Sequence, residues 1–346
     1  WTNTVIRQTS VGEETRCVTV CEGSGLVGVT LTGGSLNKAW MTGAGALVED
    51  GTVSWCCISN NVAGKRAGNN YYGGGLFISK GTVDHTIIAY NTSAAIGGGE
   101  SHGGGIGVSS PSGPIVIDTC LVYGNSAPNG KGGGLYAAFG NNHNLLTLRN
   151  TTIVNNSASS GAGGVTVTQN GTTRDIAIVN CILADNAKDG SDKNLSLPTG
   201  IDYASQSYGN VFANGTAALG EGSASYPGSG TAWFVDEANG DCHLRASAPA
   251  SDSGVWYDGI VDDLDGVVRP EEKMSSGCYE CTEVDHGVIK LSPIDVTTTT
   301  ISATASGSII SLGEGASATV TLRVGPNFEE MVVVDTAADI VTDFAL

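Results

Sequence analysis

The stretch that decides the fold is residues 73–91, which read GGGLFISKGTVDHTIIAYN. Its two landmarks, a run of glycines and a nine-residue segment that ends in Asn, recur along the chain. The last glycine of each run falls at 75, 105, 134 and 164, so the repeat is 29 or 30 residues long. A period in this range is typical of solenoids, in which one supersecondary unit stacks on copies of itself.

The nine-residue segment indicates which positions are interior. It occurs five times, as VSWCCISNN (53–61), VDHTIIAYN (83–91), IDTCLVYGN (117–125), LRNTTIVNN (148–156) and IVNCILADN (178–186). The first and sixth positions are always aliphatic and mostly β-branched, which favours short strands. The fourth is always Cys or Thr, small enough for a narrow interior, and the ninth is always Asn. We therefore predict a parallel β-solenoid in which the Asn side chains hydrogen-bond to one another from coil to coil.

Composition narrows the classes of function. Gly accounts for 51 of 346 residues, 14% of residues are charged, and the formal net charge is −18. So acidic a chain has no basic surface to neutralise phosphates, which argues against nucleic-acid binding. No apolar stretch reaches the roughly 18 residues of a membrane-spanning helix. Because the chain begins at Trp1 instead of Met, we expect a processed or excised fragment. Its Thr- and Asn-rich, Lys-poor composition favours an extracellular or cell-surface location.

Two parts of the sequence resemble known families. The segment VGVTLTGG (27–34), the glycine runs and the Asn-ending segments resemble bacterial right-handed parallel β-helix proteins and the repeats of polymorphic outer membrane proteins. Residues 234–281 resemble the closing segment of choice-of-anchor Q β-helix domains of secreted bacterial proteins, through FVD (234–236), ANGD (238–241), DLDG (263–266) and GCYE (277–280). In a departure from that pattern, Val267 and Val268 stand where the family usually has Asn-Pro. The resemblance implies the fold and a secreted bacterial address, and no particular activity.

The expected organisation is all-β. We predict a right-handed parallel β-helix over 1–281, followed by a small C-terminal β-strand region or partial β-sandwich over 282–346. Within the β-helix we expect regular coils over 51–190, irregular coils over 191–233, where the period is lost, and a closing segment over 234–281.

The second position of the repeated segment holds the candidate chemistry. There Asp84 and Asp118 should lie one coil apart, with Arg149 on the following coil and His85 beside Asp84 as a proton carrier. At about 5 Å the two carboxylates repel by ~1 kcal/mol or more, which Arg149 or a bound cation must offset. One interpretation is an acid–base or Ca²⁺ site on the flank of the β-helix. The alternative is a solvated surface with an ion pair that contributes little.

Other polar and aromatic residues are also open to two interpretations. Asp263 and Asp265 could bind Ca²⁺, which takes about six to eight oxygen ligands, or could accept backbone N–H groups in tight turns and pair with Arg269. Tyr90 and Tyr123, on adjacent coils near a bend, are the candidate ring faces for a sugar. We expect His102, and an ion pair between Lys80 and Asp50, to belong to turns and surface.

The nine cysteines are an odd number, so at least one thiol is free or pairs outside the chain. Cys56, Cys120 and Cys181 occupy one column two coils apart, about 9–10 Å, which is beyond disulfide reach. A disulfide from Cys278 or Cys281 to Cys242, or between Cys17 and Cys21, stays open.

These observations lead to one hypothesis of function and two rivals. The first is a secreted or cell-surface module, non-enzymatic, whose extended surface binds glycans or mediates adhesion. The second is a polysaccharide lyase or glycoside hydrolase that works in a groove along the β-helix through Asp84, His85, Asp118 and Arg149. The third is a structural subunit of an extracellular filament or surface layer, because the ends of a solenoid expose strand edges that can self-assemble.

Overall fold

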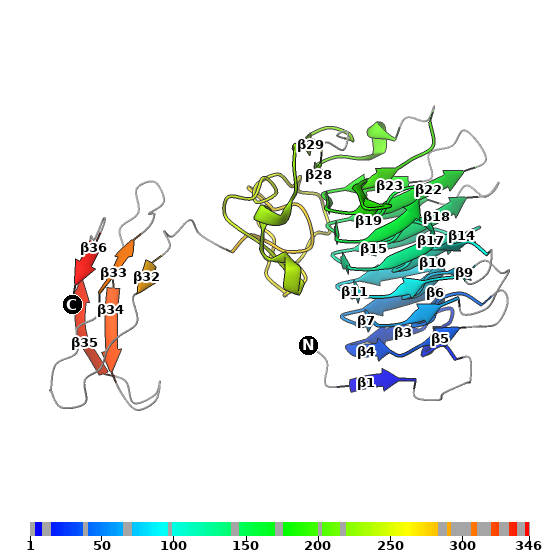
Figure 1. Cartoon of the computed structure of the whole chain (residues 1–346), viewed down its shortest axis with the longest axis horizontal. Helices are drawn as coiled ribbons and strands as arrows, with labels where there is room; N and C mark the ends of the chain where they lie inside the picture. Colours follow the sequence, from blue (N-terminus) through cyan, green and yellow to red (C-terminus); the bar gives the residue numbers. More distant parts are fainter. Residues whose placement is uncertain are drawn as a thin grey trace. The chain divides into compact units, whose positions relative to one another are not determined.

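The computed structural model describes residues 4–8, 15–36, 41–64, 71–95, 99–139, 145–169, 176–199, 203–214, 219–282, 289–291, 306–309, 320–324, 332–337 and 343–345. The chain divides into two compact units, Trp1–Cys281 and Thr282–Leu346. The first unit contains a right-handed parallel β-helix whose coils stack along one axis (Figure 1), which confirms the predicted fold class. None of the helices in the described residues is long and apolar enough to cross a membrane.

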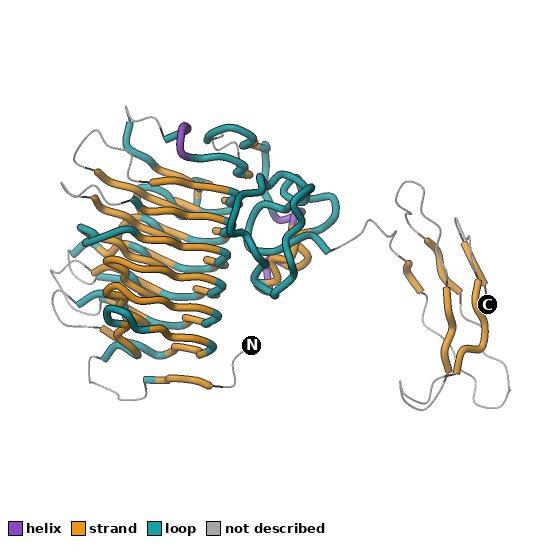
Figure 2. Tube along the Cα trace, turned by 180° about the vertical axis from the view of Figure 1, so that it is seen from behind, coloured by secondary structure: helices purple, strands orange, loops and turns teal. Residues whose placement is uncertain are grey.

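Three sheets, almost wholly parallel, form the walls of the β-helix (Figure 2). Sheet A carries the fifth to seventh positions of the repeat and consists of β1 (Thr4–Arg7), β4 (Val29–Thr32), β7 (Cys57–Ser59), β11 (Ile87–Ala89), β16 (Leu121–Tyr123), β20 (Thr152–Val154), β24 (Ile182–Ala184), β28 (Val211–Phe212) and β29 (Ala224–Ser225). Sheet B follows the Asn and consists of β5 (Ser35–Leu36), β8 (Val62–Ala63), β12 (Thr92–Ser93), β17 (Ser126–Lys131), β21 (Ser157–Ser160), β25 (Ala187–Lys188) and β26 (Ser191–Asp192).

Sheet C follows the glycine runs and ends on the first two positions of the repeat. It consists of β2 (Val18–Val20), β3 (Gly25–Val27), β6 (Ala46–Ser54), β10 (Leu76–Asp84), β14 (Ile106–Ser109), β15 (Ile115–Asp118), β18 (Leu135–Phe139), β19 (Leu146–Arg149), β22 (Val165–Gln169), β23 (Ile176–Val179) and β27 (Leu195–Ser196). A short two-stranded sheet consists of β9 (Tyr71–Tyr72) and β13 (Ser101–His102). Along the chain, each of these strands follows a strand of sheet B and directly precedes a glycine run.

Strand pairing confirms the alignment of the repeats. Val83 pairs with Val53 on one side and with Ile117 on the other, and Ile117 pairs in turn with Leu148. The side chains at these first positions and at the sixth and fourth positions are buried, most of them completely, and the apolar ones form one continuous core. Full burial of an aliphatic side chain stabilises the fold by roughly 1.5–3 kcal/mol.

The ninth position forms the predicted Asn ladder. Asn125 Nδ2 donates to Asn156 Oδ1 at 3.0 Å and to the Ile88 carbonyl at 2.8 Å. Asn125 Oδ1 accepts in turn from the side chain of Asn91 at 3.0 Å and from its backbone N–H at 2.9 Å. The same side-chain bonds run from Asn61 to Asn194. Because these side chains are buried, each depends on its neighbours to satisfy its polar groups.

The glycine runs bring the chain toward sheet C where the backbone of the next coil lies very close. A Cβ at Gly133 would stand 2.2 Å from the carbonyl oxygen of Ser157. The preceding Gly132 has a φ of +67°, which favours glycine. A positive φ recurs at Gly43, Gly73 and Gly103, and a similarly close backbone oxygen faces Gly74, Gly104 and Gly163. These constraints explain why the glycine runs recur in the sequence.

Residues 231–281, here called the lobe, occupy a different place from the one expected for a closing segment. The lobe contains η2 (Thr231–Trp233), β30 (Phe234–Asp236), η3 (Glu237–Asn239) and β31 (Asp241–Leu244), and it packs on the outward face of sheet A (Figure 1). A second core joins apolar residues of that face, among them Leu121, Val154 and Ile182, to apolar residues of the lobe. The fifth and seventh positions on this flank are mostly apolar, and the hydrophobic effect favours their burial under the lobe.

The end of the β-helix is formed instead by the irregular region before the lobe. Tyr203 and Phe212 are buried in the main core, and Leu219 packs against it. The described part of this region includes η1 (Ala204–Gln206), β28 and β29.

In the described residues of the unit Thr282–Leu346, the strands form two antiparallel sheets. One consists of β32 (Ile289–Leu291), β33 (Ser306–Ile309) and β36 (Asp343–Ala345), and the other of β34 (Val320–Val324) and β35 (Val332–Ala337). This agrees with the predicted β-rich extension.

Candidate functional site

The second column of the repeat brings Asp84, Asp118 and Arg149 together as predicted. Asp84 of β10 pairs with Asp118 of β15, and Asp118 pairs with Arg149 of β19. The guanidinium relieves the repulsion between the carboxylates, because Arg149 Nε lies 2.6 Å from Asp118 Oδ2. Asp118 Oδ1 accepts two further hydrogen bonds, from Asn150 Nδ2 at 3.0 Å and from the Thr119 hydroxyl at 3.1 Å.

Next to this column the chain turns from sheet C into sheet A through one left-handed residue per coil. These residues have φ between 41° and 54°, and they are Trp55, His85, Thr119, Asn150 and Asn180. His85 stacks on Trp55 with ring centroids 4.3 Å apart and an interplanar angle of 17°. The corner therefore holds a histidine in a fixed orientation between two coils.

A loop of the lobe, residues 255–262, lies along this corner. His85 Nε2 is 3.1 Å from Asp262 Oδ1, and Asn150 Nδ2 donates to the Tyr257 hydroxyl at 2.7 Å. Asn180 holds the backbone of Val255 with two hydrogen bonds, of 2.8 and 2.9 Å. The candidate catalytic residues thus form a seam between the β-helix and the lobe, which we call the flank seam.

Charge at the flank seam favours a protonated His85. Burial alone would lower the pKa of His85, but the nearby carboxylates of Asp84, Asp262 and Asp118 outweigh burial and raise it. The pKa of Arg149 is also raised: burial opposes its charge, but Asp118 more than compensates. A raised pKa favours the protonated imidazole, which cannot accept a proton as a general base.

The Asp263 loop matches the structural alternative for its aspartates. Asp263 is buried, and its carboxylate accepts the N–H groups of Asp265 at 2.9 Å, Val267 at 2.8 Å and Glu280 at 2.8 Å. Asp265 pairs instead with His243, at 2.6 Å. Across the described ranges of the chain, no group of three or more His, Cys, Asp or Glu side chains is arranged to hold a metal ion.

The expected partner of Arg269 is corrected by the structure. Arg269 Nη1 pairs with Glu280 Oε1 at 2.6 Å, and its other donors reach backbone carbonyls of the lobe. The carboxylate of Asp263 already accepts hydrogen bonds from backbone N–H groups, and the buried guanidinium of Arg269 pairs with Glu280.

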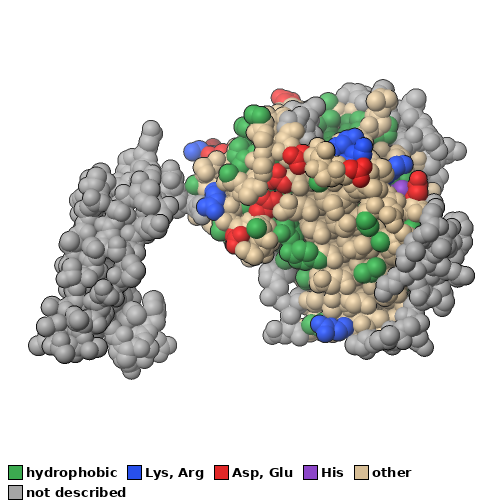
Figure 3. All heavy atoms as spheres, in the orientation of Figure 1, with side chains coloured by type: hydrophobic (Ala, Val, Ile, Leu, Met, Phe, Trp, Pro, Cys, Tyr) green, Lys and Arg blue, Asp and Glu red, His purple; other side chains and the backbone are tan. Residues whose placement is uncertain are grey.

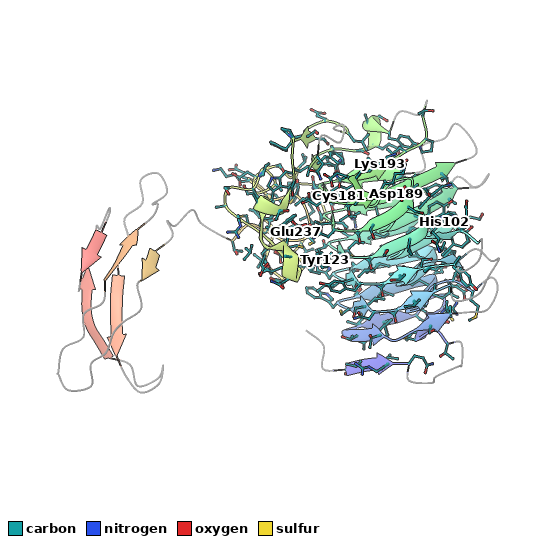
Figure 4. The ribbon with its side chains drawn as sticks, viewed as in Figure 1. His102, Tyr123, Cys181, Asp189, Lys193 and Glu237 are labelled. Atoms are coloured by element: carbon teal, nitrogen blue, oxygen red, sulfur yellow. The ribbon has the colours of Figure 1, made fainter. Side chains whose placement is uncertain are left out.

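The two candidate sugar-binding tyrosines differ in exposure. Their rings meet edge to face with centroids 5.2 Å apart, as neighbours near the bend. Tyr90 is 49% exposed. Tyr123 is buried under the lobe, and its hydroxyl donates to the Glu237 carbonyl at 2.8 Å (Figure 4). The structure therefore corrects the expectation for Tyr123, whose ring faces are not available to a ligand.

His102 also departs from the expected exposed turn residue. It is 3% exposed and stacks on Tyr136 at a centroid distance of 4.3 Å. Its Nδ1 accepts the N–H of Lys131, and its Nε2 lies 3.2 Å from Glu100 Oε2. Burial first, and then the charge of Lys131, lower its pKa to about 4, although Glu100 opposes the shift.

The predicted ion pair between Lys80 and Asp50 is present, with Lys80 Nζ 2.5 Å from Asp50 Oδ2.

None of the nine cysteines forms a disulfide in the structure. Cys56, Cys120 and Cys181 are buried in the core, as predicted for small interior residues. The disulfides left open for Cys17, Cys21, Cys242, Cys278 and Cys281 are not formed.

Two acids that the sequence did not single out lie where the lobe docks on the β-helix: Glu237 of the lobe and Asp185 of the β-helix. Glu237 is 3% exposed, and neither of its carboxylate oxygens has a hydrogen-bond partner. Asp185, at a corner after β24, has one oxygen in the same condition. Figure 3 shows acidic side chains gathered on the face where the lobe adjoins the β-helix. The burial of Glu237 could not be predicted from a repeat or motif, because it depends on where the lobe docks.

No family model, curated protein or solved structure matches the chain.

Proposed function

We propose that this chain is a secreted or cell-surface β-helix module of the choice-of-anchor Q type that binds glycans or other surface components without transforming them. The observation that carries the proposal is the flank seam. There His85 pairs with Asp262 of the lobe, Asp118 pairs with Arg149, and the Arg149 guanidinium lies over the ring of Tyr257 in the lobe. Their ordered partners favour a role in holding the lobe on the β-helix.

The rigid, polar surface of the β-helix suits binding. Coil-to-coil pairing fixes the backbone of its strands, so the backbone loses little conformational entropy when a ligand binds. Sheet B shows such a surface: Ser157 donates to Ser126 across coils at 3.0 Å, on an exposed face.

A glycan array followed by a degradation assay tests the proposal against the lyase or hydrolase alternative. We expect retention of glycans by the intact chain and no product formation with or without EDTA. Asp84→Ala and Asp118→Ala should leave glycan binding unchanged, with Asp258→Ala, exposed on the lobe, as the control. Cleavage of any glycan that Asp84→Ala or Asp118→Ala abolishes would overturn the proposal, and so would a complete absence of binding.

A further inference from the structure

The column that contains Asp84, Asp118 and Arg149 continues beyond the regular coils. Arg149 pairs with Val179, and two isolated parallel bridges extend the series from Val179 to Tyr208 and from Tyr208 to Glu221. Residues aligned in this way on successive coils face the same side of a parallel β-helix. Tyr208 and Glu221 therefore occupy the outward column one and two coils past Val179, in a region where the sequence repeat is no longer visible.

A hollow lies at this end of the column. Its volume is about 550 Å³, and it is lined mainly by Ala204, Ser205, Tyr208, Glu221, Gly222 and Val255. That size is within the range of small-ligand pockets, which run to about 300–1,000 Å³. The two successive coils that carry β28 and β29 lie beside the lobe at this end (Figure 1). Val255 comes from the lobe, and its two backbone hydrogen bonds to Asn180 fix that wall of the hollow.

The lining combines the groups that recognise a sugar ring. Tyr208 is half-buried and offers an aromatic surface, while Val255, 41% exposed, adds an aliphatic one. Such surfaces pack against the C–H faces of a sugar. Glu221 is exposed and supplies a carboxylate, an acceptor for hydroxyl groups.

We propose that this hollow is a binding site for a neutral saccharide, with one sugar ring against Tyr208 and its hydroxyl groups donating to Glu221. The inference rests on the proposed glycan-binding function and gives it a place and a ligand class. A neutral ligand is favoured over an acidic one because a uronate would meet the Glu221 carboxylate in a chain of net charge −18.

Titration calorimetry with neutral gluco-, xylo- and manno-oligosaccharides and with oligouronates tests the proposal on the full chain. We expect the wild type to bind at least one neutral series, and Tyr208→Ala and Glu221→Gln each to weaken that binding by about tenfold or more. Tyr226→Ala, which removes another exposed tyrosine outside the hollow, is the matched control and should bind like the wild type. Since Glu221 is exposed, its variant should fold even if Tyr208→Ala does not.

The outcomes separate the two proposals. If the wild type binds a neutral glycan and both hollow variants bind it equally well, the hollow is not the site, although the proposed function stands. Binding of oligouronates alone overturns the neutral ligand class. Failure to bind any glycan overturns both proposals.

Discussion

Glu237 of the lobe lies close enough to Asp185 of the β-helix for their negative charges to repel, and three of their four carboxylate oxygens have no hydrogen-bond partner. Burial first, and then the charge of Asp185, raise the pKa of Glu237 from its usual value to about 7. The lobe is thus docked over a buried acid that carries a proton more readily than an ordinary glutamate.

This pair predicts a stability that falls as pH rises. Between pH 4.5 and about 7 the folded chain holds a proton on Glu237 that the unfolded chain has released, so stability declines across this interval. The loss approaches about 3 kcal/mol above pH 7. We expect Glu237→Gln, which cannot ionise, to unfold like the wild type at pH 4.5 and at higher urea concentration at pH 8. Asp236→Asn, an exposed neighbour, is the control, and an equal effect of Glu237→Gln at both pH values contradicts the prediction.

His102 predicts the opposite dependence on pH. Its lowered pKa, about 4, means that the unfolded chain takes up a proton that the folded chain refuses as pH drops below 6.5. Stability should therefore fall by as much as about 3 kcal/mol between pH 6.5 and pH 4. An NMR titration of the imidazole C–H resonances measures the pKa of His102, on which this loss of stability depends.

The same spectrum contains an internal control for His102. Burial lowers the pKa of His243, but hydrogen bonds to Asp265 and Asp241 outweigh it, so the pKa is raised overall. His243 should titrate above pH 6.5 while His102 stays neutral to about pH 4. A His102 resonance that titrates near pH 6.5 would show that the ring is not buried between its neighbours.

Much of the fold could be predicted from the sequence because its determinants are local and repeated. Val83 and Asn91 have counterparts in all five copies of the nine-residue segment, so the sequence indicates the same burial and the same hydrogen bonds five times. The pairing of Asp84, Asp118 and Arg149 follows from that register alone.

The partners of these residues could not be predicted in the same way. Asp262 lies 177 residues from His85, and Tyr257 lies 107 residues from Asn150. Neither has a repeated counterpart, and only the docking of the lobe brings them to the corner. The burial of Tyr123 and Glu237 depends on the same docking, and Tyr208 and Glu221 lie where the period is lost.

The Asn ladder predicts a large cost for removing one member. Asn125→Ala leaves the Ile88 carbonyl and the backbone and side-chain donors of Asn91 without this partner inside the core. Each buried orphan costs about 1–3 kcal/mol, so we expect a loss of about 3 kcal/mol or more in the free energy of unfolding. Ser157→Ala, exposed on the adjoining strand, should cost less than about 1 kcal/mol. Similar losses for the two variants in urea denaturation would contradict the role of the ladder.

The flank seam predicts a local effect of Asp262→Asn. Loss of this carboxylate removes one of the charges that raise the pKa of His85, and it weakens the contact of residues 255–262 with the β-helix. Hydrogen exchange should become faster in 255–262 and stay unchanged in β10 and β15. Asp258→Asn, exposed on the same loop, should change neither segment. Unaltered exchange in the Asp262 variant would mean that the seam does not hold the lobe.

The contacts of the lobe also depend on the count of coils beneath it. Asp262 meets His85, Tyr257 meets Asn150 and Val255 meets Asn180, three corner residues of different coils. If the stack skipped or duplicated a coil, these partners would no longer face one another. The lobe can therefore dock fully only on a correctly assembled stack, so its attachment distinguishes a complete β-helix from one with slipped register.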